Sequence, residues 1–352
     1  MLRISALSTA LLLALTGCST IGGDDPEPTA SDSGREVGGQ VVLVTHDSFN
    51  LPKKLVRSFE QESGIDLVTR AAGDAGTLTA KLSLTKDDPT GDLAFGVDNT
   101  FASRPLDEGV FAAYAPTLPT GAEQYALDEG AGELTPIDVG NVCVNVDTTW
   151  FDDEGITPPQ TLDDLADPTY RDLFVTPGAS TSSPGMAFLL ATIAEYGDEW
   201  PSYWQDLLAN GTKVVDGWED AYYGDFTQGG GKGTRPIVVS YDSSPAFTVK
   251  DGASSTAALL DTCFRQVEYA GVLSGAANPA GAEKVIDWLL SDEVQAALPT
   301  AMYVFPVSAA VEVPADWAEF AVQPTEPLSV SPADIAANRE QWLSEWTDLV
   351  TR

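Results

Sequence analysis

The stretch QVVLVTHDSFNLPKKLVRSFEQESG, residues 40–64, shows the unit from which most of the chain is built. Its first six residues form a short apolar run, which predicts a buried strand over 40–45. After a polar turn, Pro52 opens a helical pattern, and Gly64 stands where a helix commonly stops. A strand that leads into a helix is the repeating unit of α/β folds, so this stretch predicts that fold class.

The same alternation of apolar runs and helical patterns continues to the C-terminus. It predicts helices that cover a largely parallel sheet. The chain beyond residue 38 is long enough for two α/β lobes, which we expect to be joined by crossing strands. The further predicted strands are 66–70, 92–95, 139–146, 173–175, 236–241 and 264–272, and the further predicted helices are 78–84, 184–196, 200–209, 282–298 and 332–351.

Residues 1–18 carry the pattern of an export signal. Their apolar run, 6–15, is too short to span a bilayer as a helix. The run ends in LTGC at 15–18, the lipobox pattern in which the cysteine becomes the acylated N-terminus of the mature protein. We therefore expect Cys18 to anchor the protein to the outer face of the cell membrane; the alternative is an ordinary signal peptide with an incidental cysteine. Residues 19–38 are rich in Gly, Ser, Pro and acidic residues, which predicts a flexible tether.

The charge of the chain is strongly one-sided. Its 18 Lys and Arg residues face 53 Asp and Glu residues, a formal net charge of −35. Nucleic acids and anionic lipid surfaces are therefore poor partners. Cationic ligands are attracted at long range, but acidity this general is not a site, and a surface tuned for solubility in a salty medium accounts for most of it.

Two cysteines remain besides Cys18. Cys143 and Cys263 reach an oxidising space, where they either form a disulfide or stay as small buried thiols. Their separation in the sequence does not decide between these alternatives. Neither stands beside another cysteine or a histidine, so no zinc site is predicted.

The sequence lacks the common catalytic motifs. It holds one histidine, His46, and neither a G-x-S-x-G nucleophile elbow, an H-E-x-x-H zinc motif nor a Walker phosphate loop. The run GGGKG at 229–233 lacks the spacing of a phosphate loop and precedes a strand, which predicts a surface turn. We therefore expect a binding protein without cofactor or metal, and no enzyme.

Small polar residues gather where predicted strands end and helices begin. HDSF at 46–49 follows the first strand, and SSP at 182–184 and at 243–245 opens two helices. Serine before proline is an ordinary helix N-cap, whereas two such caps that converge would offer free N–H groups to an anion. Aromatic residues flank these turns and belong either to the core or to a ligand platform: Trp218, Tyr241 and Phe247.

Six segments together resemble the thiamine-binding proteins of bacterial ABC importers. Each is weak alone, but their ordered combination is fairly specific, above all GW followed by SY-x-x-SPA at the expected interval. In chain order they are VTHDSF at 44–49, SSPG at 182–185, KVVDGWEDAY at 213–222, SYDSSPAF at 240–247, LPTAMYVFPVS at 298–308 and NREQWLSEW at 338–346.

The resemblance implies a type II periplasmic-binding-protein fold. In this α/β fold two hinged lobes, each with a mixed, mostly parallel sheet flanked by helices, close on a ligand. The resemblance places lobe 1 at 39–138 plus 267–303 and lobe 2 at 139–266 plus 304–352. It also implies a monomer that delivers its ligand to the permease subunits of an ABC importer.

The resemblance further implies ligand contacts at the motif positions. Asp74, in the segment GDAGTL, matches the acidic contact, and Trp218 matches the ligand tryptophan. His46, Phe247 and Tyr303 stand where the family often has tyrosine, tyrosine and tryptophan; at His46 a phenol is lost, which leaves the stacking partner open. The remaining implied contacts are Asp47, Ser182 and Ser183, the last two at the phosphate or hydroxyethyl end, and the stretch Tyr241, Asp242, Ser243 and Ser244.

The implied ligand is thiamine, with its phosphates as further candidate ligands. Its permanent thiazolium charge is stabilised by aromatic faces, worth about 2 kcal/mol when desolvated. Helix N-termini at Ser183 and Ser244 would suit phosphate oxygens. The alternatives are an iron(III)- or polyamine-binding protein on the same fold and, less favoured, an extracytoplasmic hydrolase. Iron favours paired tyrosines, but Tyr222 and Tyr223 are neighbours in a helical pattern and are expected to point in different directions.

Overall fold

The computed structural model describes residues 38–351. The predicted signal peptide with Cys18, and the predicted tether up to residue 37, lie outside the described residues. Over 38–351, no helix combines the length and the apolar character needed to cross a membrane.

One mixed sheet of nine strands runs through the described part of the chain. Its order is β2-β1-β3-β10-β4-β7-β5-β6, and β11 pairs with β4. The sheet is less parallel than expected, because the two central strands pair antiparallel with each other and with β3 and β7. The strands are β1 (Gly39–Thr45), β2 (Ile65–Ala71), β3 (Leu93–Asp98), β4 (Thr135–Asp147), β5 (Phe174–Pro177), β6 (Lys213–Val215), β7 (Ile237–Tyr241), β10 (Thr256–Val272) and β11 (Phe305–Pro306), with a separate hairpin of β8 (Val249–Lys250) and β9 (Ala253–Ser254).

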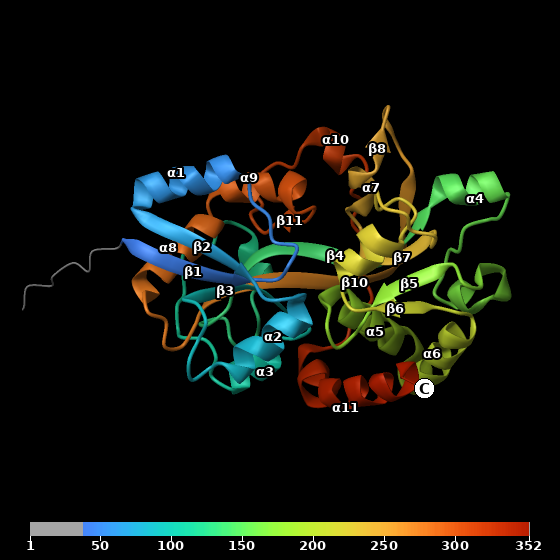
Figure 1. The fold of residues 1–352 in the computed structure, drawn as a ribbon, viewed down its shortest axis with the longest axis horizontal. Coiled ribbons are helices and arrows are strands. Elements are labelled where there is room, and N and C mark those ends of the chain that lie inside the picture. Colours follow the sequence, from blue (N-terminus) through green and yellow to red (C-terminus); the bar gives the residue numbers. More distant parts are fainter. Residues whose placement is uncertain (1–37, 352) are drawn as a thin grey trace, which may run out of the picture. The chain divides into compact units, whose positions relative to one another are not determined.

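Helices pack on both ends of this sheet. Figure 1 shows β4 and β10 side by side in the middle, with β1–β3 on one side and β5–β7 on the other. The helices are α1 (Lys53–Ser63), α2 (Ala75–Leu84), α3 (Ser103–Asp107), α4 (Thr148–Glu154), α5 (Ser183–Tyr196), α6 (Trp200–Ala209), α7 (Ser244–Phe247), α8 (Pro279–Leu289), α9 (Asp292–Ala301), α10 (Ala315–Ala318) and α11 (Pro332–Val350). Short 3₁₀ turns lie at Ala122–Tyr125, Asp163–Ala166, Pro168–Tyr170 and Gly197–Glu199, and a π-helical turn lies at Asp220–Asp225.

Local sequence explains α1. Pro52 is its N-cap residue, and Gly64 ends it with φ 72°, a left-handed conformation that favours glycine. Leu55 and Phe59 are the buried residues of the helix and pack against β1 and α8. The predicted strand–helix unit at residues 40–64 is therefore confirmed.

The hydrophobic core is divided between the two ends of the sheet. At the β1–β3 end, α1, α8 and α9 pack over the strands. At the β5–β7 end, α5, α6 and α11 do so, with Trp204 and Trp346 in edge contact. Val304 and Val307 pack with the β1–β3 end, although the expected boundary after residue 303 assigns them to lobe 2. The division into two lobes itself stays a prediction.

Two predicted elements differ in the structure. The helix expected over 282–298 is two helices, α8 and α9, because Ser291 interrupts it: its hydroxyl donates to the Trp288 carbonyl (2.6 Å) and accepts the Val294 N–H (3.4 Å), which caps α9. The strand expected at 264–272 begins earlier, at Thr256, so β10 extends alongside β4 across both ends of the sheet.

A disulfide between Cys143 and Cys263 joins these two long strands. Their Cα atoms lie 4.1 Å apart, and both residues are buried. The bridge sits where the β10 register shifts between Leu259 and Phe264. Within this bulge the Thr262 hydroxyl accepts the Val144 N–H at 2.9 Å, in place of a ladder bond.

Candidate functional site

A cavity lies where residues of the two ends of the sheet meet. Its empty space, with the open solvent at its mouth included, is about 630 Å³. Its walls come from the turn after β1, the first turns of α2, α5 and α7, the segment 218–223, β10 and the residues after α9. Loops and helix starts thus supply most of the lining, as is common in α/β binding sites.

One side of the cavity is an aromatic wall of six residues, Trp218, Tyr222, Tyr223, Tyr241, Phe247 and Tyr303. The Trp218 and Tyr222 rings stack with centroids 5.1 Å apart, and Phe247 meets Tyr303 edge-on at 4.8 Å. The indole N–H of Trp218 donates to the Ser240 hydroxyl at 3.0 Å, which fixes the ring. Such a wall presents π-faces suited to a flat cation.

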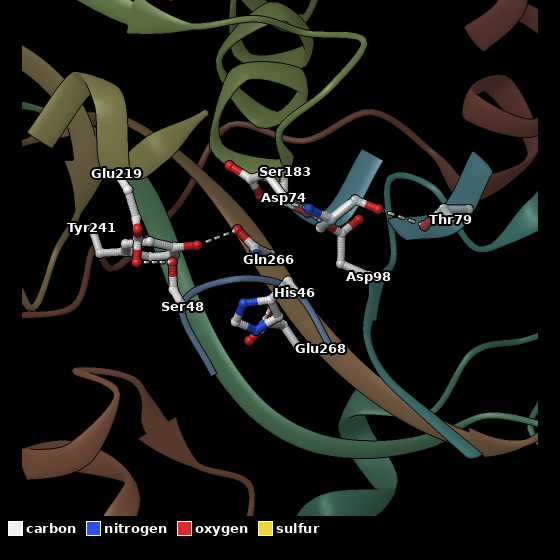
Figure 2. Close-up of polar contacts among 11 residues, drawn as sticks. His46, Ser48, Asp74, Thr79, Asp98, Ser183, Glu219, Tyr241, Gln266 and Glu268 are labelled. Atoms are coloured by element: carbon white, nitrogen blue, oxygen red, sulfur yellow. Dashed lines mark hydrogen bonds and ion pairs between the residues drawn. The ribbon is translucent and has the colours of Figure 1, made fainter. Parts of the chain in front are cut away.

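Another part of the cavity lining carries Asp74, His46 and Glu268. The His46 Nε2 lies 3.4 Å from a carboxylate oxygen of Glu268, and both side chains are buried; Figure 2 shows the imidazole lying against this carboxylate. Burial lowers the pKa of His46, but the neighbouring carboxylates of Glu268, Asp74 and Asp47 outweigh it, so the pKa lies above its ordinary value. This side of the cavity is therefore acidic, with one titratable base in it.

Asp74 also joins the two ends of the sheet. One of its oxygens accepts the Ala75 N–H (2.6 Å) and so caps α2, and the other accepts the Trp218 N–H (2.8 Å). Burial raises the pKa of Asp74, and these hydrogen bonds oppose that rise. Because α2 packs on β3 while Trp218 packs beside β5 and β7, one carboxylate links both walls of the cavity.

Further contacts close the structure around the cavity. The Thr77 N–H donates to the Thr181 carbonyl at 3.2 Å, and the Ser48 hydroxyl donates to Glu219 at 3.4 Å. The Ser183 hydroxyl donates to the Asp98 carboxylate. At Gly76 the backbones come so close that a Cβ would lie 2.6 Å from the Ser180 carbonyl oxygen, so only glycine fits.

Gly96 and Ser243 do not line the cavity, but each affects the position of a residue that does. Gly96 has φ +103°, and a Cβ there would lie 2.2 Å from the His46 ring, so this glycine makes room for the imidazole. Tyr303 has φ 56°, a left-handed conformation that is strained for a tyrosine. The Ser243 hydroxyl donates to the Tyr303 carbonyl and so supports this turn.

Eight predicted ligand-binding residues line the cavity, and four do not. Asp47 accepts the Gly73 N–H (3.0 Å) away from it, and Ser182 is fully buried before α5. Asp242 accepts a hydrogen bond from the Asn141 side-chain amide (2.7 Å), and burial raises the pKa of Asp242 to about 6. The Ser243 hydroxyl donates to the Tyr303 carbonyl. Ligand contact by the eight stays a prediction: His46, Asp74, Ser183, Trp218, Tyr241, Ser244, Phe247 and Tyr303.

The sequence interpretation missed several lining residues. Glu268 lies within an apolar strand, where no motif marks it, and only strand pairing brings it beside His46. Tyr222 ends the segment KVVDGWEDAY and Tyr223 follows it directly, so this segment could have indicated them. The other missed lining residues are Ser48, Ala75, Pro184, Met302 and Val304.

Tyr222 and Tyr223 both line the cavity, with ring centroids 5.5 Å apart and ring planes at 86° to each other. They lie in the π-helical turn Asp220–Asp225, whose wider turn changes the angle between neighbouring side chains. Tyr222 is 2% exposed and Tyr223 41%. No cluster of three or more His, Cys, Asp and Glu residues suited to a metal ion occurs among residues 38–351.

A cavity between the two ends of a mixed sheet, lined by aromatic rings and buried carboxyl groups, is the arrangement of a solute-binding protein. Residues 88–338 match the model of the family described as bacterial extracellular solute-binding proteins, and the chain belongs to this family. It is therefore a binding protein and not an enzyme.

Its similarities are more specific than the family. The chain is 30% identical over 325 residues to the thiamine-binding periplasmic protein of Escherichia coli K12, which covers 89% of this chain and 94% of that protein. A solved structure described as a periplasmic thiamin binding protein superposes with a TM-score of 0.78 at 29% identity, over 89% of this chain and 96% of the other. A ferric binding protein from Campylobacter jejuni has a TM-score of 0.68 at 16% identity, over 88% of this chain and 99% of the other, which shows a shared fold alone.

Proposed function

We propose that this protein captures thiamine in the cavity described above and delivers it to an ABC permease. The observation that carries the proposal is that the aromatic wall and the carboxyl groups of Asp74 and Glu268 line one cavity. Two similar proteins whose names state thiamine binding, one of known sequence and one of known structure, support the same ligand.

The chemistry of thiamine fits both faces. Its thiazolium ring carries a fixed positive charge, which no change of pH removes, and a buried cation needs compensating groups. An aromatic face supplies about 2 kcal/mol for a desolvated cation, and a carboxylate supplies the opposite charge. The wall around Trp218 and the acidic side at Asp74 would hold the two rings of the ligand between them.

Thiamine phosphates fit less well than the sequence suggests. α5 offers its N-terminus at Ser183, but the Ser183 hydroxyl is already bonded to the Asp98 carboxylate, which would repel a phosphate. α7, which begins at Ser244, has only four residues, so its helix dipole is weak. We therefore infer a preference for unphosphorylated thiamine.

Closure of two lobes is the proposed mechanism of capture. A ligand that touches both walls favours the closed state by its greater affinity for that state. The bond from the Trp218 N–H to Asp74 and that from the Thr77 N–H to the Thr181 carbonyl exist only when the two sides meet. Asp74 would thus balance the charge of the ligand and also stabilise the closed state through its hydrogen bond with the Trp218 N–H.

Calorimetric titration of the full-length protein with thiamine and with thiamine monophosphate tests the proposal. We expect saturable binding of thiamine at micromolar concentrations or below, and weaker binding of the monophosphate. Absence of heat, together with absence of protection against thermal unfolding by thiamine, would rule out the proposed function. Stronger binding of the monophosphate would overturn the inferred preference alone.

The lipid anchor at Cys18 is part of the same proposal. The lipobox pattern LTGC supports acylation, and residues 19–38 would hold the binding domain away from the membrane. Cys18→Ser should move the protein from the membrane fraction to the soluble fraction of its host. Unchanged membrane retention of this variant would argue against the anchor.

A further inference from the structure

Three buried carboxyl groups form a row across three neighbouring strands. In the strand register Glu268 of β10 stands opposite Asp98 of β3 on one side and opposite Asp138 of β4 on the other. Residues directly opposite each other on paired strands project from the same face of the sheet, close enough to interact. Asp98 and Asp138 are 0% exposed and Glu268 is 6% exposed. We call these three residues the carboxyl row.

The carboxyl row has few partners for three acids. Asp98 accepts the Thr100 N–H and hydroxyl, each at 2.6 Å, the Phe101 N–H at 3.2 Å and the Ser183 hydroxyl. Both carboxyl oxygens of Asp138 are buried without a hydrogen-bond donor among residues 38–351. Glu268 meets the imidazole of His46, at 3.4 Å, and the carboxyl group of Asp138 beside it.

Like charges opposed in a dry interior cannot all remain ionised. Burial raises the pKa of Asp98 to about 7, and burial together with Glu268 raises the pKa of Asp138 well above its ordinary value. Other titratable or charged groups that interact with the row are His46, Tyr241, Tyr269 and, through its interaction with Asp98, Arg339 of α11. In the empty protein the row therefore holds at least one proton.

Glu268 connects this row to the ligand cavity. It lines the cavity, whereas Asp98 and Asp138 stand behind it on either side, away from the ligand. Figure 2 shows Glu268 with His46 at the cavity and Asp98 beside Ser183. A fixed positive charge placed at Glu268 would supply the counter-charge that a proton supplies in the empty protein.

We propose that capture of the cationic ligand releases a proton from the carboxyl row, with Glu268 as the residue that couples the two. This inference rests on the proposed function, because it requires a ligand with a fixed positive charge. On binding, an O–H bond of a carboxylic acid in the row breaks and the proton passes to solvent, while the ligand cation balances the carboxylate that remains. Discharge of a protonated His46 acts in the same direction.

The sign of the pH dependence follows from this exchange. At low pH the carboxyl row and His46 hold their protons. The ligand cation must then either displace these protons or bind beside them without a counter-charge, so the affinity for the ligand is low. As the pH rises the competing protons leave and affinity increases. Release of one proton per ligand corresponds to a tenfold gain in affinity for about each pH unit.

Calorimetry in two buffers of different ionisation enthalpy, such as phosphate and Tris at one near-neutral pH, counts the protons. For the full-length protein and thiamine we expect release of about one proton per ligand. Dissociation constants measured from about pH 6 to about pH 8 should fall with rising pH. Glu268→Gln and Asp138→Asn should each reduce the proton release by at least about half and flatten this pH profile. Asp261→Asn, an exposed acid on the same strand, should change neither.

The outcomes separate this inference from the proposed function. Thiamine binding with the same heat in both buffers and a flat pH profile overturns the proton release while the proposed function stands. If thiamine does not bind at any pH, both the proton release and the proposed function are overturned. Proton release that survives Glu268→Gln unchanged overturns the role of the carboxyl row. If Asp138→Asn does not fold, Glu268→Gln and the wild-type pH profile still decide the question.

Discussion

Trp218 shows how a single residue can serve both the fold and the site. Its backbone N–H binds Asp74, its indole binds Ser240, and its ring stacks on Tyr222 in the aromatic wall. The side chain is only partly buried, in contrast to Trp204, which is 0% exposed in the core at the β5–β7 end. Trp218 is therefore a cavity residue, whereas Trp204 is a core residue.

Trp218→Ala should weaken thiamine binding by at least about tenfold, because it removes the largest π-face of the wall. Its free energy of unfolding should change little compared with that of Trp204→Ala, for which we expect a loss of about 3–5 kcal/mol. Titration calorimetry and urea unfolding measure the two effects, and Trp218→Phe should retain most of the affinity. Equal destabilisation by both alanine variants would place Trp218 in the core instead.

At the scale of elements, Asp147 joins the end of β4 to the start of α4. Its carboxylate accepts the Trp150 N–H at 3.0 Å as the cap of α4, and it also accepts hydrogen bonds from Thr227 and Gln228 at 2.6 and 2.9 Å. Burial raises the pKa of Asp147, but these hydrogen bonds outweigh it, and the pKa lies below its ordinary value of 3.8. The ionised cap is thus stabilising.

Asp147→Ala should lower the free energy of unfolding at neutral pH by about 1–2 kcal/mol, the typical loss for a helix cap. Because the folded-state pKa is depressed, this stabilisation is present above pH 3.8 and is lost as the pH falls below that value. Urea unfolding of wild type and variant at several pH values measures the difference. Asp153→Ala, an exposed acid on α4, should stay within about 0.5 kcal/mol of wild type. A difference that persists unchanged below pH 3.8 would contradict this account.

At the scale of the whole described molecule, β4 and β10 carry the connection between the two ends of the sheet. They pair from Asp147 with Thr256 to Thr135 with Ala270, and their disulfide closes a loop with a sequence separation of 120 residues. A bridge over so long a loop removes many conformations of the unfolded chain. It should therefore stabilise both ends together.

The double variant Cys143→Ser, Cys263→Ser should lose about 2–4 kcal/mol of unfolding free energy. Wild type unfolded in the presence of reductant should show a similar loss, whereas reductant should not affect the double variant. Mass shifts on alkylation of the denatured protein, with and without prior reduction, count the free thiols. Two free thiols without reduction would show that the bridge does not form.

Local sequence sufficed for features whose causes lie within a few residues. The Pro52 and Gly64 signals at the ends of α1, the serine-proline starts of α5 and α7, and the alternation that indicates an α/β fold all depend on short-range stereochemistry. The ordered motifs also placed Trp218, Tyr241 and Tyr303 at one site, through resemblance. The break at Ser291 was missed because the apolar pattern continues across it.

Only the tertiary structure decided which side chains face the cavity and which lie behind it. Asp242 and Ser243 stand beside Tyr241 and Ser244 in the sequence, yet they bind Asn141 and Tyr303 outside the cavity. Glu268 meets His46, Asp98 and Asp138 through strand pairing over sequence separations that no local pattern records. The amino-acid sequence by itself determined the fold class and the ends of α1, because these follow from local backbone and apolar patterns. Its resemblance to a known family indicated the chemical character of the site. The register of β3, β10 and β4 decided the carboxyl row, because opposing positions across a sheet are set by the packing of the whole domain.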